Sequence, residues 1–189
     1  MTGVLRPDYP IKTERLVLRP FTESDLDALY AYQRLPEVAR YLMWPPRDRH
    51  QTATALKYRI AHPTLEREGD ILVFAVELTG TLIGDVNLSW QSEPDRTGEF
   101  GFVFDPRHHG HGYALEAATE VLRLGFEAGL HRIIGRADAR NTASAGLMTR
   151  LGLRKEAHFV KNAYIKGEWT DEVVYAMLAE EWRQRRVEP

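Results

Sequence analysis

Hydrophobic and polar positions follow a strand-like pattern in the middle of the chain and a helix-like pattern directly after it. Residues 71–104 contain three apolar runs separated by short polar segments, which predicts three successive strands that pair antiparallel. From about residue 113 onward, Glu116, Glu120 and Arg123 recur at helical spacing as one narrow polar stripe. The wide apolar surface on either side of this stripe predicts a helix packed against a sheet and ending at Gly129.

The flanking segments complete a mixed arrangement of strands and helices. A capping box at Thr22 predicts a helix up to about Arg34, with Pro36 as its end, and an aromatic loop follows at 41–46. A strand over 132–138 returns from the central helix by a right-handed crossover, so we expect it to run parallel to the strand that begins at Glu99. The remaining predictions are a strand at 14–19, helices at 48–61 and 142–151, an antiparallel pair at 154–164 and 171–178, and a short C-terminal helix or tail at 180–186.

Composition limits the class of protein. A chain of 189 residues with 43% hydrophobic content can bury one full core, so we expect a single domain over 11–189 and a flexible lead-in over 1–10. The net charge of −2, with both signs mixed along the chain, argues against a nucleic-acid partner. The absence of cysteine excludes disulfides and thiol catalysis. No segment resembles a signal peptide or a membrane span, which predicts a cytoplasmic protein without a membrane partner.

A histidine- and glycine-rich segment, Arg107–Gly112, joins the apolar strand to the central helix. Asp105-Pro106 stops the strand because proline cannot donate to the sheet. Glycines allow a close backbone approach, and the first amides of a helix have no partner within it, so this segment predicts an anion site to which Arg107 adds a charge-assisted contact. An ordinary strand-to-helix turn explains the same two glycines.

Other ligands fit the segment less well. A Walker loop needs Gly-Lys-Ser/Thr at the helix start, and a dinucleotide fingerprint needs a third glycine where Leu115 stands. The three histidines have only Asp105 as a nearby carboxylate and alternate in a tight loop, which disfavours a metal cluster. We therefore expect His108, His109 and His111 to flank a phosphate, with no metal.

A second motif further along the chain indicates a family. It consists of Asn141-Thr142-Ala143-Ser144 followed by Leu151-Gly152-Leu153. Together with Arg107-x-x-Gly110-x-Gly112-Tyr113-Ala114, the chain resembles the GNAT acetyltransferase superfamily, and within it the RimJ/RimL-like branch of ribosomal-protein N-terminal acetyltransferases. The resemblance extends over residues 11–183 and includes the opening Thr13-Glu14-Arg15-Leu16, the pair Ile83-Gly84 and the ending from Asp171 to Trp182.

This resemblance implies a fold and a donor. The fold is the α/β (α+β) GNAT fold, a single mixed and mostly antiparallel sheet of about seven strands flanked by about four helices, with a central parallel pair splayed to hold acyl-CoA. The donor is acetyl-CoA, with its diphosphate on the glycine loop and its pantetheine arm along the strand 102–104. Asn141 would bond the pantetheine amides, although asparagine is also a preferred helix N-cap. The implied donor-binding residues are Phe102, Val103, Phe104, Arg107, His108, His109, Gly110, His111, Gly112, Tyr113, Ala114, Asn141 and Ser144.

Catalytic and acceptor residues follow from the same resemblance. Many members place a tyrosine four residues after Ser144, where this chain has Met148, so Ser144 is the expected hydrogen-bond donor to the departing thiolate. A small residue needed for close helix packing is the alternative. Glu99 is the candidate general base, or else an exposed carboxylate at a strand end. Trp44 and Tyr164, with Trp169 as a weaker candidate, are expected to line the acceptor pocket or to be core aromatics.

The implied reaction is transfer of an acetyl group from acetyl-CoA to a primary amine by direct attack in a ternary complex. The acceptor is either a protein N-terminal α-amine or a small-molecule amine. Two alternatives remain at this stage: a non-catalytic module that senses acyl-CoA, and the same chemistry with another donor such as succinyl-CoA. A monomer and a homodimer are both compatible with the sequence.

Overall fold

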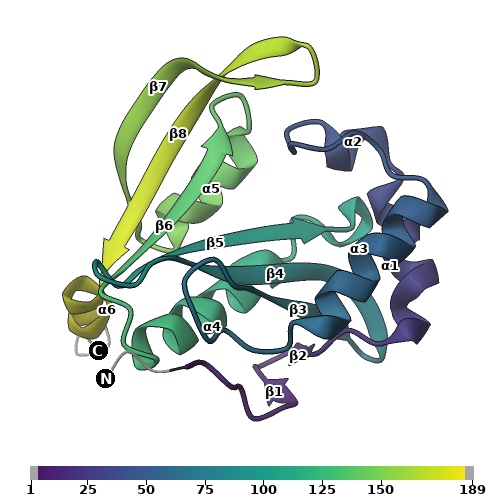
Figure 1. Ribbon diagram of the computed structural model, residues 1–189, viewed down its shortest axis with the longest axis horizontal. Coiled ribbons are helices and arrows are strands. Elements are labelled where there is room, and N and C mark those ends of the chain that lie inside the picture. The colour runs from purple at the N-terminus through teal and green to yellow at the C-terminus, as the bar shows by residue number, and fades with distance from the viewer. Residues whose placement is uncertain (1–3, 186–189) are drawn as a thin grey trace.

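Eight strands form one sheet in the order β1-β2-β3-β4-β5-β6-β8-β7 in the computed structural model, which describes residues 4–185 (Figure 1). The strands are β1 Ile11–Lys12, β2 Val17–Arg19, β3 Ile71–Leu78, β4 Thr81–Ser92, β5 Thr97–Phe104, β6 Arg132–Asp138, β7 Arg154–Ile165 and β8 Glu168–Leu178. The helices are α1 Leu26–Gln33, α2 Pro36–Ala39, α3 Arg49–Ala61, α4 Tyr113–Glu127, α5 Thr142–Arg150 and α6 Ala179–Arg185. Single 3₁₀ turns lie at Glu23–Asp25 and Pro106–His108.

The sheet is antiparallel except at its centre. β5 and β6 run parallel, and their ladder joins only Thr97–Glu99 to Arg132–Ile134. Beyond Glu99, β5 remains paired with β4 as far as Phe104, while β6 continues with β8. The predicted mixed sheet with a splayed parallel pair is therefore confirmed, with one more strand than expected.

The helices differ in number from the prediction for a simple reason. Pro36 was expected to end the first helix, which does end at Gln33, but Pro36 then opens the short helix α2. Proline is tolerated at the first helical position because the amide it lacks would have no partner there. The C-terminal α6 lies where a short helix or tail was expected, and the described chain has six helices in all, against the about four that the family resemblance implied.

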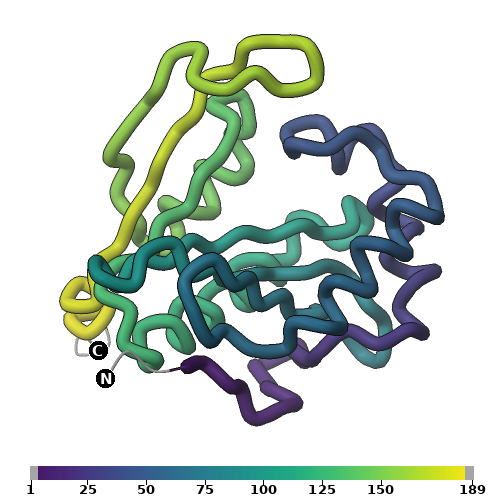
Figure 2. Tube along the Cα trace, in the orientation of Figure 1, coloured from purple at the N-terminus to yellow at the C-terminus, as the bar shows by residue number. Residues whose placement is uncertain are grey.

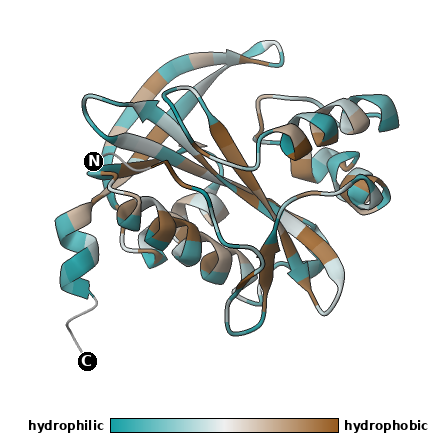
Figure 3. Cartoon of the chain, turned by 60° about the horizontal axis from the view of Figure 1, so that its bottom comes forward, coloured by the Kyte–Doolittle hydropathy of each residue, from teal (hydrophilic) through white to brown (hydrophobic). Residues whose placement is uncertain are grey.

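Helices cover both faces of the sheet and create two apolar layers. One cluster joins α4 and α5 to the sheet through side chains such as Val121, Leu122 and Met148. The second joins α1 and α3 to the opposite face through Leu29, Leu56 and neighbours on β3 and β4. Figure 3 shows hydrophobic positions concentrated on the central strands and hydrophilic ones on the outer sides of the helices. Because side chains of β5 point into both apolar layers, this strand contacts the α4–α5 layer on one face and the α1–α3 layer on the other.

The N-terminal segment is anchored to the domain by its residue Leu5. The Leu5 side chain is 8% exposed, and its backbone forms a bridge with Leu65. The expected flexible lead-in therefore has a packed part, while residues 1–3 lie outside the described residues. No helix within residues 4–185 is long and apolar enough to span a membrane.

Candidate active site

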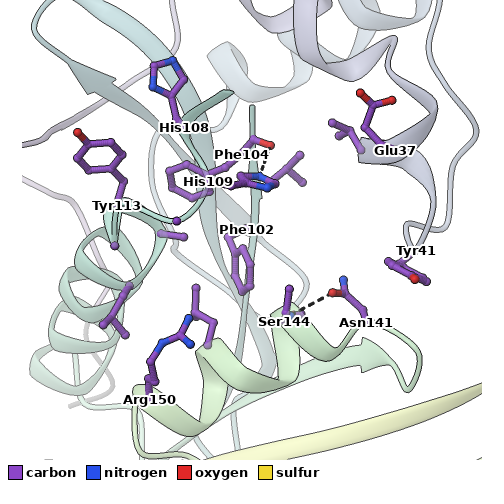
Figure 4. Close-up of a pocket in the computed structure, with 18 of the residues that line it drawn as sticks. Glu37, Tyr41, Phe102, Phe104, His108, His109, Tyr113, Asn141, Ser144 and Arg150 are labelled. Carbon is purple, nitrogen blue, oxygen red and sulfur yellow. Dashed lines mark hydrogen bonds between the residues drawn. The ribbon is translucent and has the colours of Figure 1, made fainter. Parts of the chain in front are cut away.

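A cavity of about 570 Å³ lies where β5 separates from β6. Four segments line it: β5 at 102–104, the glycine loop with the first turn of α4, the start of α5, and the α2 region (Figure 4). The segments are far apart in sequence, yet most of the residues that the family resemblance implied for the donor lie on this one surface.

The β5 wall of the cavity offers free backbone groups. The ladder with β6 ends at Glu99, whereas the pairing with β4 continues to Phe104. Successive residues of a strand direct their amides and carbonyls to alternate sides, so part of the 100–104 backbone faces the cavity without a strand partner. Such groups can hydrogen-bond an extended ligand with amides of its own.

The glycine loop has the backbone geometry of an anion site. Gly110 and Gly112 have φ values of +80° and +82°, a conformation that L side chains rarely adopt. A Cβ on Gly110 would meet no atom within 4 Å, so a side chain would find room there. Glycine is favoured at this position because of its left-handed backbone conformation. The Glu116 amide makes the first backbone bond of α4, to the Gly112 carbonyl, which leaves the preceding amides of the helix start available. His108, His109, Tyr113 and Ala114 line the cavity with the two glycines.

Two residues predicted for the donor site lie elsewhere. The Arg107 guanidinium donates to Asp105, with Nη2 2.6 Å from Oδ2, and its side chain is 74% exposed outside the cavity. His111 stacks on the Tyr113 ring and also does not line the cavity. Within the described residues, no group of three or more His, Asp or Glu side chains is arranged to hold a metal ion.

The start of α5 contributes Asn141 and Ser144. The Asn141 Oδ1 atom accepts from the Ser144 amide at 3.1 Å, so asparagine is the helix N-cap (Figure 4). This bond uses only the side-chain oxygen, and the Asn141 Nδ2 remains a donor beside the cavity. Met148 is buried, and its sulfur leaves no room for a Cβ on Gly135 of β6. The place where many family members carry a tyrosine is therefore part of the core in this chain.

Glu99 lies on the opposite face of β5 from the α4 layer and does not line the cavity. It alternates with Phe100 along the strand, so its side chain points to the face covered by α1 and α3. Its carboxylate is 3.3 Å from the Arg136 Nε, and Arg136 also pairs with Glu172 at 3.2 Å. Burial raises the pKa of Glu99, the Arg136 charge opposes this, and Glu172 adds to it, with a net pKa above the usual carboxyl range.

The acceptor side differs in detail from the sequence prediction. Within the aromatic loop, Tyr41 and Leu42 line the cavity, whereas Trp44 does not and instead carries the Arg47 guanidinium 4.2 Å above its ring. Tyr164 and Trp169 are 63% and 60% exposed, with ring centroids 5.3 Å apart. The aromatic loop predicted from the sequence thus contributes two residues to the cavity wall, and which of its side chains turns inward depends on the packing of α2.

The end of the β7–β8 hairpin lies across from α2 (Figures 1 and 2), and one side chain connects the two segments. The Lys166 ammonium donates to the carbonyls of Ala39 at 2.6 Å and Arg40 at 3.0 Å. On the same hairpin, Glu168 accepts from Arg140, whose guanidinium also lies 6.0 Å from the Tyr41 ring centroid. These contacts link the hairpin, the α2 region and the β6–α5 loop at one end of the site.

Further lining residues were not anticipated from the sequence. Arg150, in the last turn of α5, lines the cavity and carries a cation to it, and Glu37 of α2 brings a carboxylate from the other side (Figure 4). The sequence placed Arg150 in the expected helix at 142–151 but did not indicate which way its side chain points. Only the placement of α5 against α4 shows that this face is turned to the cavity.

Comparison with known proteins gives the family. Residues 15–154 match the family described as Acetyltransferase (GNAT) domain. YnaD, an uncharacterized N-acetyltransferase of Bacillus subtilis (strain 168), is 34% identical over 178 residues, 91% of this chain and 98% of that protein. The crystal structure of an acetyltransferase (GNAT family) from Bacillus anthracis is 33% identical, with a TM-score of 0.82 over 91% of this chain and 99% of that one. RimL, a ribosomal alpha-N-protein acetyltransferase in complex with coenzyme A, shares the fold at a TM-score of 0.77 and 18% identity, over 89% of this chain and 97% of that one.

The chain belongs to the GNAT acetyltransferase family. The superfamily resemblance drawn from the sequence is thereby confirmed, and the protein is an acetyl-CoA-dependent N-acetyltransferase of the GNAT type. This sets aside the alternative of a non-catalytic sensing module. RimL is among the solved structures that share the fold, and at 18% identity this likeness shows the fold alone, so the RimJ/RimL-like branch stays a prediction.

Proposed function

We propose that the protein transfers an acetyl group from acetyl-CoA to a primary amine by direct attack in a ternary complex. One observation carries the proposal: a single cavity joins the unpaired edge of β5 to the glycine loop and to the start of α5. Acetyl-CoA has a diphosphate near one end, amides along its pantetheine arm and a thioester at the other end. These three parts match the glycine loop, the unpaired edge of β5 and the start of α5, in that order. The diphosphate meets backbone amides, and the arm meets an open strand edge.

The donor is proposed to lie along the cavity with its diphosphate at residues 110–114. The left-handed glycines and the unpaired amides at the start of α4 support this end. The pantetheine arm is proposed to extend the sheet along 102–104, with Asn141 Nδ2 donating to one of its carbonyls. His108 and His109 would flank the phosphates, and His109 is already held by the Phe104 carbonyl, 3.1 Å from its Nε2.

The chemistry needs a neutral amine, a stabilised oxyanion and a leaving thiolate that is stabilised by a hydrogen bond and then takes a proton from water. The amine nitrogen forms a bond to the thioester carbon, and the carbon–sulfur bond breaks as the tetrahedral intermediate collapses. A backbone amide of β5 is proposed to stabilise the oxyanion. Glu99 is proposed to accept the amine proton, directly or through water, and the Ser144 hydroxyl to donate a hydrogen bond to the thiolate. The raised pKa of Glu99 suits a base that works near neutral pH.

The acceptor is proposed to approach from the α1–α3 side of β5. Glu99 and Glu172 provide two carboxylates against the single Arg136 guanidinium there, which favours a protonated amine at the point of entry. Trp44 and Tyr164 are proposed to contact the acceptor at the rim, together with Tyr41. A protein N-terminus and a small amine both satisfy this chemistry, and the RimL name refers to the first kind of acceptor.

A thiol-release assay tests the proposal directly. The panel contains a peptide with a free α-amine, the same peptide with a blocked N-terminus, a polyamine and a free amino acid, each with acetyl-CoA or succinyl-CoA as donor. We expect CoA release above hydrolysis with at least one free amine and none with the blocked peptide. Release only with succinyl-CoA would contradict acetyl transfer, and no release with any amine would contradict the primary-amine acceptor.

A further inference from the structure

The opening motif of the chain lies against the glycine loop, although the two are far apart in sequence. Arg15, in the turn between β1 and β2, donates from Nη1 to the His111 carbonyl at 2.9 Å. Its guanidinium carbon lies 4.8 Å from the centroid of the Tyr113 ring. A Cβ on Gly112 would come within 3.4 Å of the Arg15 Nη2. Arg15 therefore bonds the loop at His111, lies beside Gly112 and stacks on Tyr113, the first residue of α4.

The same arginine is fixed by a carboxylate in the first turn of α4. Glu116 accepts from the Arg15 Nε at 2.7 Å, from the Arg15 amide at 2.8 Å and from the Thr13 hydroxyl at 2.6 Å. The Glu116 side chain is largely buried. Burial raises its pKa, but the hydrogen bonds from Thr13 and Arg15 together lower the pKa below the ordinary value, so it is ionised at neutral pH.

This arrangement has an electrostatic consequence for the loop. An ionised Glu116 one turn from the loop amides would by itself repel an incoming diphosphate. Arg15 offsets that charge and also restrains the His111 carbonyl, so the amides that follow it keep one orientation. Arg107, the cation that the sequence suggested for the anion site, is instead paired with Asp105.

We infer that Arg15 is a positioning residue for donor binding, acting through the His111 carbonyl and Glu116 on the loop that receives the diphosphate. The inference rests on the proposed function, because it assumes that this loop is where the donor's diphosphate binds. It also explains the Thr13-Glu14-Arg15-Leu16 motif. Thr13 and Arg15 both hydrogen-bond the Glu116 carboxylate, and Arg15 also bonds the His111 carbonyl of the glycine loop.

Two donors that differ in the diphosphate test this role. R15A is expected to raise the KM for acetyl-CoA about tenfold with kcat unchanged, the loss typical of a charge-assisted contact. The KM for S-acetylpantetheine, which lacks the diphosphate, is expected to stay the same. A merely structural defect would affect both donors. The matched control is R123A, which removes an arginine that pairs with Glu120 and Glu127 on the same helix, away from the loop. It should change neither KM.

Measurements of CoA binding test the role of Arg15 independently of acyl transfer. Calorimetric titration with CoA should show the same tenfold weakening in R15A even if the acceptor is never found. R15K, which keeps the charge but not the fork of donors, is expected to fall between R15A and the wild type, and it also serves if R15A folds poorly. Equal CoA affinity in R15A and wild type, or equal losses for both donors, would overturn the inference. Absence of acyl transfer in the wild type, although it binds CoA, would instead count against the proposed function.

Discussion

The proposed donor side and the proposed acceptor side of the site are built in different ways. The donor side is a continuous piece of chain, with β5, the glycine loop and the start of α4 following one another, and α5 added by one crossover. The acceptor side is assembled from three separate segments, namely the α2 region, the β6–α5 loop and the β7–β8 hairpin, joined by Lys166 and Arg140. The donor side therefore depends mainly on backbone conformation, and the acceptor side on side-chain contacts between exposed segments. Substitutions on the two sides should differ in size and in the substrate they affect.

The largest effect is expected at Glu99, the proposed general base. E99Q should lower kcat/KM about a hundredfold, the usual contribution of a general base. Because the base must be ionised, activity should rise with pH through the raised pKa of Glu99, and E99Q should lose this acid limb. pH–rate profiles of both proteins provide the check.

The neighbours of Glu99 sharpen that test. Glu172 raises the pKa of Glu99, so E172Q should move the acid limb to lower pH, whereas Arg136 lowers it, so R136A should move the limb to higher pH. A limb that stays in place in both variants would assign it to another group.

The next largest effect is expected from substituting a glycine whose backbone conformation shapes the proposed donor side. G110V should weaken CoA binding about thirtyfold, since forcing an L side chain into a left-handed conformation costs about 2 kcal/mol. G167V is the matched control on the acceptor side: Gly167 has a φ of +90° and, like Gly110, no atom within 4 Å of a Cβ. Its CoA affinity should equal that of the wild type in calorimetry. Equal losses in the two variants would remove the proposed difference between the sides.

A smaller effect is expected at Ser144. S144A should reduce kcat about tenfold by removing a hydrogen bond to the leaving thiolate, while CoA affinity stays unchanged. T149A removes another hydroxyl from the same helix, one that bonds the Ala145 carbonyl, and should leave kcat unaffected. Steady-state kinetics with calorimetry distinguish the roles: a change in CoA affinity with kcat intact would indicate packing and not catalysis.

The smallest effect is expected at the link between hairpin and α2. K166M should raise the acceptor KM about threefold, because exposed charge-assisted contacts contribute little, and should leave the acetyl-CoA KM unchanged. K161M is the control on the same hairpin, since Lys161 and Lys166 share a left-handed backbone, with φ values of +49° and +50°. If K161M and K166M behave alike, the link has no part in acceptor binding.

Much of the donor side could be read from the sequence because its signals are local. The turn at Asp105-Pro106, the glycines at 110 and 112 and the helical stripe of α4 follow one another without interruption, and backbone rules act on neighbouring residues. Asn141 as a helix cap belongs to the same kind of signal. Arg107 shows the limit of such reasoning, because proximity in sequence suggested a ligand contact where Asp105 is the closer partner.

The sequence by itself determined the family and most of the strands and helices, missing β1 and α2, and it indicated the loop that is proposed to hold a diphosphate. Only the tertiary structure decided where the β5–β6 ladder ends, that Arg15 reaches the glycine loop, that Met148 is buried and that Tyr41, not Trp44, lines the cavity. The physical reason is that helices, strands and turns follow from interactions between near neighbours in the chain. Which side chains meet across the fold depends on the packing of whole elements, and no single stretch of sequence contains that information.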